Sequence, residues 1–286
     1  MKLIVGAHMP ITGGIDVAAS RAEELGLPAF QIFTRSPRGW LYQKLSEKSI
    51  DQFKRIKGDK YVSVNSHMPY LVNFASPKDS IYKMSIQSLK YELKTASALE
   101  LNHVVLHVGS HLGKGLDFGK KRVADAIKLA LDDVACECNV LLENMAGQAN
   151  SVGSRFYDLG GILNLIDDKR VGICLDTCHA YAAGYDIASA SGLHSMLDEI
   201  NNHIGLDRIK LVHLNDSKSR LGGGLDRHEK IGKGYIGIKG FKKILSDSTF
   251  ATLPLILETP VNDYHEYADE IQVINNIICD DTELKV

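Results

Sequence analysis

Histidine and carboxylate side chains recur in this 286-residue chain at the ends of short apolar segments. Imidazole nitrogens and carboxylate oxygens are ligands of zinc and related transition metals, and a carboxylate can bridge two ions. The nine candidate ligands are His67, His107, Glu143, Asp176, His179, His213, Asp226, His228 and Glu258. Because one zinc ion needs only three or four protein ligands, this set predicts a cluster of two or three ions.

The charge of such a cluster bears on what it could bind. The chain has a formal net charge of −2, which argues weakly against nucleic acid, because DNA-binding domains usually present a basic surface. With its acids ionised and its histidines neutral, the ligand set carries −4, and three zinc ions would add +6. The excess of positive charge would attract a phosphodiester without help from Lys or Arg.

Each of these residues has a simpler interpretation when it is taken alone. A single histidine at a strand end is more often a hydrogen-bonded structural residue. Asp176 and His179 could form a turn and a helix cap, and Glu143 or Glu258 could form an ion pair at the rim. Nine such coincidences at one end of the molecule are hard to defend together, so we retain the metal cluster. His8 ends the first apolar segment and could support a ligand. The histidines expected away from the cluster are His103, His194, His203 and His265.

The apolar segments predict the elements that position these residues. Eight of them resemble strands buried on both faces of a parallel sheet, at residues 2–8, 29–34, 61–67, 103–109, 139–144, 171–176, 210–216 and 253–258. Apolar residues at helical spacing lie between them, at 15–25, 46–56, 84–99, 123–135, 156–166, 193–204, 238–245 and 264–278. This alternation predicts an α/β fold, a single (β/α)8 TIM barrel over residues 1–286, with the active site at the C-terminal ends of the strands.

Composition also indicates the cellular compartment of the chain and whether its cysteines form disulfides. Apolar residues make up 44% and charged residues 24% of the chain, which suits one sizeable core. No apolar run is long enough to span a membrane, and the N-terminus lacks the features of a secretory signal, so we expect a cytoplasmic protein without a membrane partner. The five cysteines, an odd number without paired CxxC motifs, argue against a disulfide scaffold. We expect Cys136 and Cys138 to be small buried hydrophobes and Cys178 to be a reduced structural thiol.

Longer motifs around the candidate ligands are similar to those of the endonuclease IV family. They are HVGSH (107–111), ENMAGQ (143–148), GICLDTCHAYAAGYD (172–186), HLNDSKS (213–219), DRHEKIGKGYIG (226–237) and LILETP (255–260). The resemblance runs from the GAH at 6–8 to the last predicted helix, which is nearly the whole chain. It implies a barrel with three zinc ions per chain, and all nine ligand positions carry the residue type that the family pattern requires.

The resemblance also implies how the ligands are shared. The first ion would be held by His67, His107 and Glu143. Glu143 would bridge to the second ion, held also by Asp176, His213 and Glu258. The third ion would be held by His179, Asp226 and His228.

The activity that the resemblance implies is hydrolysis of the phosphodiester 5′ to an abasic site in double-stranded DNA, a step of DNA repair. The products would be a 3′-hydroxyl and a 5′-deoxyribose phosphate, and trimming of blocked 3′ ends stays open. A hydroxide bridging two ions, positioned by the catalytic ligand Glu143, would be the nucleophile, because zinc lowers the pKa of bound water to about 7.

Three further residues match positions that the family inserts into the DNA stack: Arg38, Tyr70 and Leu71. An abasic nucleotide costs less to extrude, because it has no base to unstack. Taken alone, Tyr70 and Leu71 could cap a hydrophobic rim and Arg38 could be a solvated loop residue. Met68 departs from the pattern, because a small or polar residue is expected there.

Two other functions fit parts of this sequence. Sugar isomerases and epimerases use the same barrel and rim, but they typically need about four carboxylate-rich ligands and one metal centre, whereas this rim has five histidines among nine ligands. A DNA-damage binder without activity is the other alternative, and the intact ligand set argues against it. Mn²⁺ or Fe²⁺ could replace zinc at individual sites. We expect a monomer, the default for a barrel that wraps DNA. We expect no nucleotide cofactor, because the three glycines at 222–224 suggest a flexible loop and not a phosphate cradle.

Overall fold

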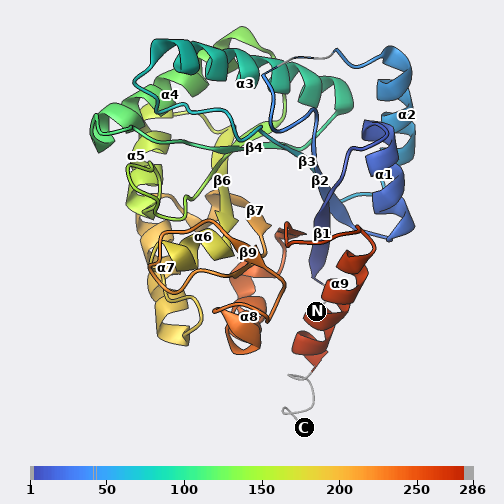
Figure 1. The fold of residues 1–286 in the computed structure, drawn as a ribbon, viewed down its shortest axis with the longest axis vertical. Coiled ribbons are helices and arrows are strands. Elements are labelled where there is room, and N and C mark those ends of the chain that lie inside the picture. The colour runs from blue at the N-terminus through green and yellow to red at the C-terminus, as the bar shows by residue number, and fades with distance from the viewer. Residues whose placement is uncertain (1–2, 41, 43, 280–286) are drawn as a thin grey trace.

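Eight parallel strands close into a barrel in the computed structural model, which describes residues 3–40, 42 and 44–279 (Figure 1). They are β1 (Ile4–Met9), β2 (Ala29–Phe33), β3 (Ser63–His67), β4 (His103–His107), β5 (Asn139–Glu143), β6 (Val171–Asp176), β7 (Ile209–His213) and β10 (Pro254–Leu257). Their order around the barrel follows the chain, and β1 closes it by pairing with both β2 and β10. The predicted (β/α)8 class is therefore confirmed. Lys2 of the first expected strand, and both ends of the expected domain 1–286, lie outside the described residues.

Helices surround this barrel, and α6 lies beside β6 and β9 (His228–Glu229) (Figure 1). The helices are α1 (Ile15–Glu24), α2 (Glu47–Lys57), α3 (Asp79–Leu99), α4 (Leu116–Asp133), α5 (Phe156–Ile166), α6 (Thr177–Ala182), α7 (Ala190–His203), α8 (Gly237–Ser246) and α9 (Glu266–Cys279). Serine hydroxyls cap two of them: Ser46 accepts from Ser49 N, and Ser189 from Gly192 N, each at 3.1 Å. None of the helices described is long and apolar enough to cross a membrane.

One apolar layer fills the barrel below the candidate ligands. It consists of Ala29, Val105, Leu141, Cys174, Leu211 and Ile256, all fully buried. Successive side chains on a strand point to opposite faces, so the residue two positions further along points inward again. On or directly after five of the strands, that residue is a candidate ligand: His107, Glu143, Asp176, His213 or Glu258. The intervening residues, such as Val140 and Leu142, pack in a larger core that includes the helices.

The observed boundaries differ from the predicted ones where an element lacks an apolar repeat. The predicted helix begins at residue 84, whereas α3 begins at Asp79. Asp79 and Ser80 are exposed, so the first turn shows no apolar repeat. The predictions contain no helix at α6, whose six residues are too few to show helical periodicity. The predicted alternation of strands and helices also omits a short antiparallel pair, β8 (Asp216–Ser217) and β9 (His228–Glu229).

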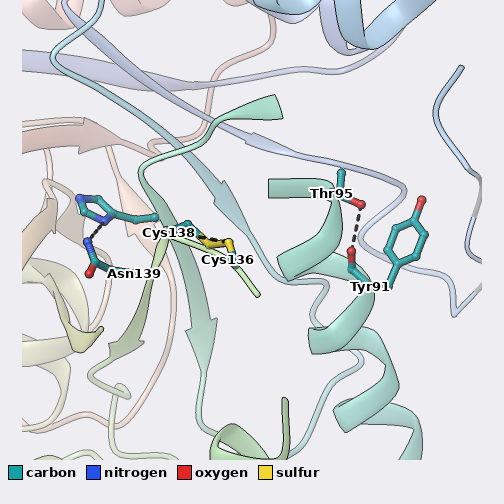
Figure 2. The surroundings of a disulfide bond; sticks show 6 residues. Tyr91, Thr95, Cys136, Cys138 and Asn139 are labelled. Carbon is teal, nitrogen blue, oxygen red and sulfur yellow. Dashed lines mark hydrogen bonds between the residues drawn. A yellow bond between two sulfur atoms is a disulfide. The ribbon is translucent and has the colours of Figure 1, made fainter. Parts of the chain in front are cut away.

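Cys136 and Cys138 lie in the loop between α4 and β5, beside Asn139 (Figure 2). Both side chains are buried, as expected. The expectation of two separate thiols is wrong, because the structure joins them in a disulfide with their Cα atoms 5.5 Å apart. That separation is within the range that a disulfide spans, so a single intervening residue is sufficient for pairing.

Candidate metal centre

Glu143 lies at the centre of the candidate ligands, fully buried at the end of β5. Its Oε2 is 3.0 Å from His67 Nε2 and 3.2 Å from His107 Nε2. Its Oε1 is 3.2 Å from Nδ1 of both His179 and His213. Each oxygen therefore faces two imidazoles, which is the arrangement that a carboxylate needs in order to bridge two metal ions.

Two of the three predicted ion sets form tight groups. The ligand atoms of each group lie within 4.8 Å of one another. The first group consists of His67, His107 and Glu143, and the second of Glu143, Asp176, His213 and Glu258.

The third predicted set is more open. Asp226 Oδ1 is 3.1 Å from His179 Nε2 and 3.6 Å from His228 Nε2. His179 and Asp226 form a tight group with His107, whereas His228 forms one with Asp176 and Cys178. The three predicted residues therefore lie in one place, but their ligand atoms are farther apart than those of the other two sets.

Neighbouring charges shift the pKa of Glu143 and the pKa of His179 in opposite directions. Burial alone would raise the pKa of Glu143, but the neighbouring His107 and His213 hold it well below its ordinary value. Burial would lower the pKa of His179, but Asp176, Asp226 and Glu143 raise it well above its ordinary value. A cation that binds through His179 must therefore displace a proton from its ring.

The donor atoms of the cluster fit metal ions. Nε2 of His228 is buried without a hydrogen-bond partner, although buried polar atoms normally have one. The nitrogen and oxygen donors are those that zinc takes. Cys178 fits less well, because burial raises the pKa of its thiol to about 12 and its Sγ donates to Arg227 O at 3.5 Å. Cys178 is a free thiol, as expected.

Asp176 both caps α6 and faces the cluster. Its Oδ1 accepts from His179 N at 2.6 Å, so this carboxylate begins the helix that carries His179. Its Oδ2 lies 3.5 Å from His228 Nε2 and accepts from Asn215 Nδ2 at 2.8 Å. Asp176 can therefore cap the helix with one oxygen and serve as a ligand with the other. The cap fixes the position of Asp176 relative to His179.

Amide side chains that the sequence analysis did not single out support the ligands. Asn144 Oδ1 accepts from Asp176 N at 2.8 Å, and Asn215 Oδ1 accepts from Glu258 N at 2.9 Å. Both asparagines lie in the motifs ENMAGQ and HLNDSKS, which could have identified them. His8 supports a ligand as expected, because its Nδ1 lies 3.2 Å from Glu258 Oε1.

A cavity of about 600 Å³ opens over the cluster. Six candidate ligands line it: His67, His107, His179, Asp226, His228 and Glu258. Lys218 and Arg227 line it as well, and the sequence analysis missed both, although they lie in the motifs HLNDSKS and DRHEKIGKGYIG. Two cations beside the cavity suit an anionic ligand.

Tyr70 and Leu71 follow β3; Tyr70 lines this cavity, and Leu71 lines a neighbouring pocket together with Tyr70. Tyr70 is 61% exposed, and its ring centre lies 5.5 Å from that of Phe33 and 6.0 Å from that of His67. Leu71 is 37% exposed, and Arg38 is exposed in the loop after β2. Met68 is 1% exposed and packs in the core, so its departure from the family pattern does not reach the solvent.

A closed barrel with a histidine–carboxylate cluster at the C-terminal ends of its strands defines a TIM-barrel metalloenzyme. Residues 19–277 match the family model described as a xylose isomerase-like TIM barrel. The chain is 46% identical over 264 residues to a probable endonuclease 4 of Methanoculleus marisnigri, covering 91% of this chain and 94% of that protein. It is 43% identical over 258 residues to a probable endonuclease 4 of Halothermothrix orenii, covering 90% and 93%. The chain belongs to the endonuclease IV family and is an enzyme of the AP-endonuclease type, as the motifs predict.

Solved structures agree with this assignment. Endonuclease IV from Thermus thermophilus aligns with a TM-score of 0.86 at 34% identity, covering 96% of this chain and 99% of that one. A D-tagatose 3-epimerase-like protein aligns with a TM-score of 0.73 at 19% identity, covering 99% and 100%. The second likeness shows the fold alone, and it explains why a sugar epimerase competes with a nuclease in the sequence analysis.

Proposed function

We propose that this chain is a zinc-dependent DNA-repair endonuclease that hydrolyses the phosphodiester 5′ to an abasic site in duplex DNA. The observation that carries the proposal is Glu143, whose two oxygens lie 3.0–3.2 Å from the ring nitrogens of four histidines. Relatives named endonuclease 4 support nuclease activity.

Three zinc ions would occupy the cluster in this proposal, in the sets already described. When bound, they would acidify water at neutral pH and neutralise the charge of a phosphodiester. Glu143 would hold two of them at a fixed separation, because it ends a buried strand and each of its two oxygens faces a different pair of imidazoles. Lys218 and Arg227 would attract the DNA backbone toward the cavity.

Tyr70 and Leu71 would fill the gap that an extruded abasic nucleotide leaves in the helix. Both side chains are exposed, Tyr70 lines the cavity, and an aromatic ring can stack on a neighbouring base. Arg38, exposed on the neighbouring loop, would insert from the β2 side. The proposal includes a monomer with one domain over residues 1–286, active on DNA in the cytoplasm and requiring no nucleotide cofactor.

Incubation of the purified protein with a duplex that contains one reduced abasic-site analogue tests the proposal. The reduced analogue cannot undergo β-elimination, so any cut reports hydrolysis. We expect one cut 5′ to the lesion, with a 3′-hydroxyl, and no cut in the matching intact duplex. Elemental analysis of the same sample should find three zinc ions per chain.

Three outcomes would overturn the proposal. Failure of folded, metal-loaded protein to cut would reject the nuclease, and a single metal ion with turnover of a ketose would establish the sugar isomerase or epimerase instead. Tight binding to the abasic duplex without cleavage, at full metal content, would establish a DNA-damage binder.

A further inference from the structure

Gln31 occupies the position on β2 that corresponds to the metal ligands of other strands. It follows Ala29 by two residues, and Ala29 belongs to the apolar layer inside the barrel. On five other strands, the residue two positions after this layer is a candidate ligand. A neutral amide is a weaker metal ligand than imidazole or carboxylate, so Gln31 calls for a different explanation. Its side chain is fully buried.

The Gln31 amide connects two ligands of the second ion set. Its Nε2 donates to Glu258 Oε1 at 2.6 Å. Its Oε1 lies 3.0 Å from His213 Nε2, within hydrogen-bonding distance. His8 Nδ1 lies 3.0 Å from Gln31 Nε2 and 3.2 Å from Glu258 Oε1, which completes a buried network behind the ligands.

The carboxylate of Glu258 decides which way the amide points. A carboxylate oxygen only accepts hydrogen bonds, so the NH₂ group must face Glu258 and the carbonyl oxygen must face His213. An amide turned the other way would place two acceptor oxygens 2.6 Å apart. The carbonyl then requires a proton on His213 Nε2, and in neutral imidazole this leaves Nδ1 as the atom with the free electron pair.

His213 Nδ1 is the atom that faces the cluster. It lies 3.2 Å from Glu143 Oε1 and 3.1 Å from Glu258 Oε2. Gln31 and His8 both contact Oε1 of Glu258, so Oε2 is the oxygen of Glu258 that faces His213 Nδ1. The partner of a ligating histidine normally fixes its tautomer, and loss of such a partner typically weakens metal binding by about 10–100-fold.

We infer that Gln31 is a positioning residue, which holds His213 in the tautomer that binds metal through Nδ1 and turns Oε2 of Glu258 toward the same ion. The inference rests on the proposed metal-dependent function, because it names the residue that prepares the second ion set. It assigns Gln31 no contact with DNA and none with a metal ion.

Two variants of Gln31 separate its size from its hydrogen bonds. Gln31→Met keeps a similar shape and removes both hydrogen bonds. Gln31→Glu keeps an acceptor for His213 but places a second carboxylate against Glu258. Asn65→Leu is the matched control, because Asn65 is a fully buried amide that pairs in register with Gln31 and accepts from Ser63 Oγ at 2.8 Å.

Zinc affinity, measured on the full-length proteins by competition with a chelator, is the first readout. We expect both Gln31 variants to bind one of the three ions about 10–100-fold more weakly than the wild type, with Asn65→Leu unchanged. The second readout is ¹¹³Cd–¹⁵N coupling in cadmium-loaded protein, which identifies the nitrogen of His213 that binds the metal. We expect Nδ1 in the wild type and in Gln31→Glu, and a mixture of ring nitrogens or no coupling in Gln31→Met.

Unchanged affinity for every ion in folded Gln31→Met would overturn the inference and leave the proposed function intact. Coupling to Nε2 of His213 in the wild type would do the same. A wild-type protein that binds no metal and does not cut abasic DNA would overturn both.

Discussion

Asp226 meets His179 across the mouth of the barrel, with its Oδ1 3.1 Å from the Nε2 of His179. His179 stands on α6, whereas Asp226 comes from the loop that leads into β9. The segment that follows β9 is held by a buried carboxylate, Asp216, at the start of the partner strand β8. Its oxygens accept from the backbone N–H groups of Ser217, Gly232, Gly234, Ile236 and Gly237 at 2.7–3.2 Å.

The chain around Asp216 packs so closely that it requires a glycine. A Cβ at position 234 would lie 2.5 Å from Asp216 Oδ1 and 2.4 Å from Ser217 O. Asp216→Asn replaces one acceptor oxygen by an NH₂ group that faces backbone donors. We expect a loss of about 1–3 kcal/mol in the free energy of unfolding, together with weaker binding of the ion near Asp226 and His228. Denaturant unfolding and zinc content measure the two effects.

Asp207→Asn, an exposed position in the turn before β7, is the control for Asp216→Asn. It should change neither quantity. Full stability and full zinc content in Asp216→Asn would show that the loop holds its shape without this carboxylate.

Replacement of Glu143 should reduce activity and metal binding together. Glu143→Ala removes the two oxygens that face four imidazoles, so we expect cleavage of abasic DNA to fall by about a thousandfold or more, which is roughly 4 kcal/mol of barrier. Bound zinc, measured by elemental analysis, should fall by up to two ions per chain. Glu137→Ala, an exposed glutamate at the opposite end of β5, should behave as wild type. Full activity in Glu143→Ala would remove this carboxylate from the mechanism.

Tyr70 should affect DNA binding without affecting metal. Tyr70→Ala removes an exposed ring at the mouth of the cavity, and stacking on a base contributes about 1–3 kcal/mol. We expect the Kd for an abasic duplex, measured by fluorescence anisotropy, to rise by about tenfold or more, with zinc content unchanged. Tyr157→Ala, a half-exposed tyrosine on α5, is the control. A loss of zinc in Tyr70→Ala would mean that the residue supports the metal ligands instead.

His103, at the start of β4, should make stability depend on pH. Burial, with the positive charge of Lys210, lowers the pKa of His103 to about 4, and Asn139 Nδ2 donates to its Nδ1 at 3.2 Å. Between about pH 6.5 and 4 the unfolded chain binds a proton here that the folded chain does not, so stability falls as the pH falls through this window. Above pH 6.5 the residue is neutral in both states and has no effect.

His103→Gln removes this titration. The free energy of unfolding of the variant, relative to wild type, should therefore rise between pH 6.5 and 4 by at most about 3 kcal/mol, since solvent screens the partly exposed ring. Urea unfolding of both proteins across this range measures the difference, in which the titration of all other groups cancels. Parallel curves for the two proteins would contradict the lowered pKa.

The sequence alone determined the barrel and the ligand types, because both depend on local spacing. Apolar runs alternating with helical repeats predict eight strands and their helices, and strand geometry sends every second side chain inward. Thus, if Leu141 points into the barrel, Glu143, two residues further along, must point inward as well. The same rule, applied to Ala29, would have identified Gln31, although not its partners.

Tertiary structure decided which of these groups meet. Asp226 lies against His179, and Gln31 lies between His213 and Glu258, only because strands and loops distant in the chain converge at one end of the barrel. The joining of Cys136 to Cys138, and the positions of Lys218 and Arg227 beside the cavity, likewise depend on loop conformation. Loops lack a hydrophobic period, so their shape follows from hydrogen bonds such as those that Asp216 accepts from Gly234 N and Ile236 N, which no local spacing predicts.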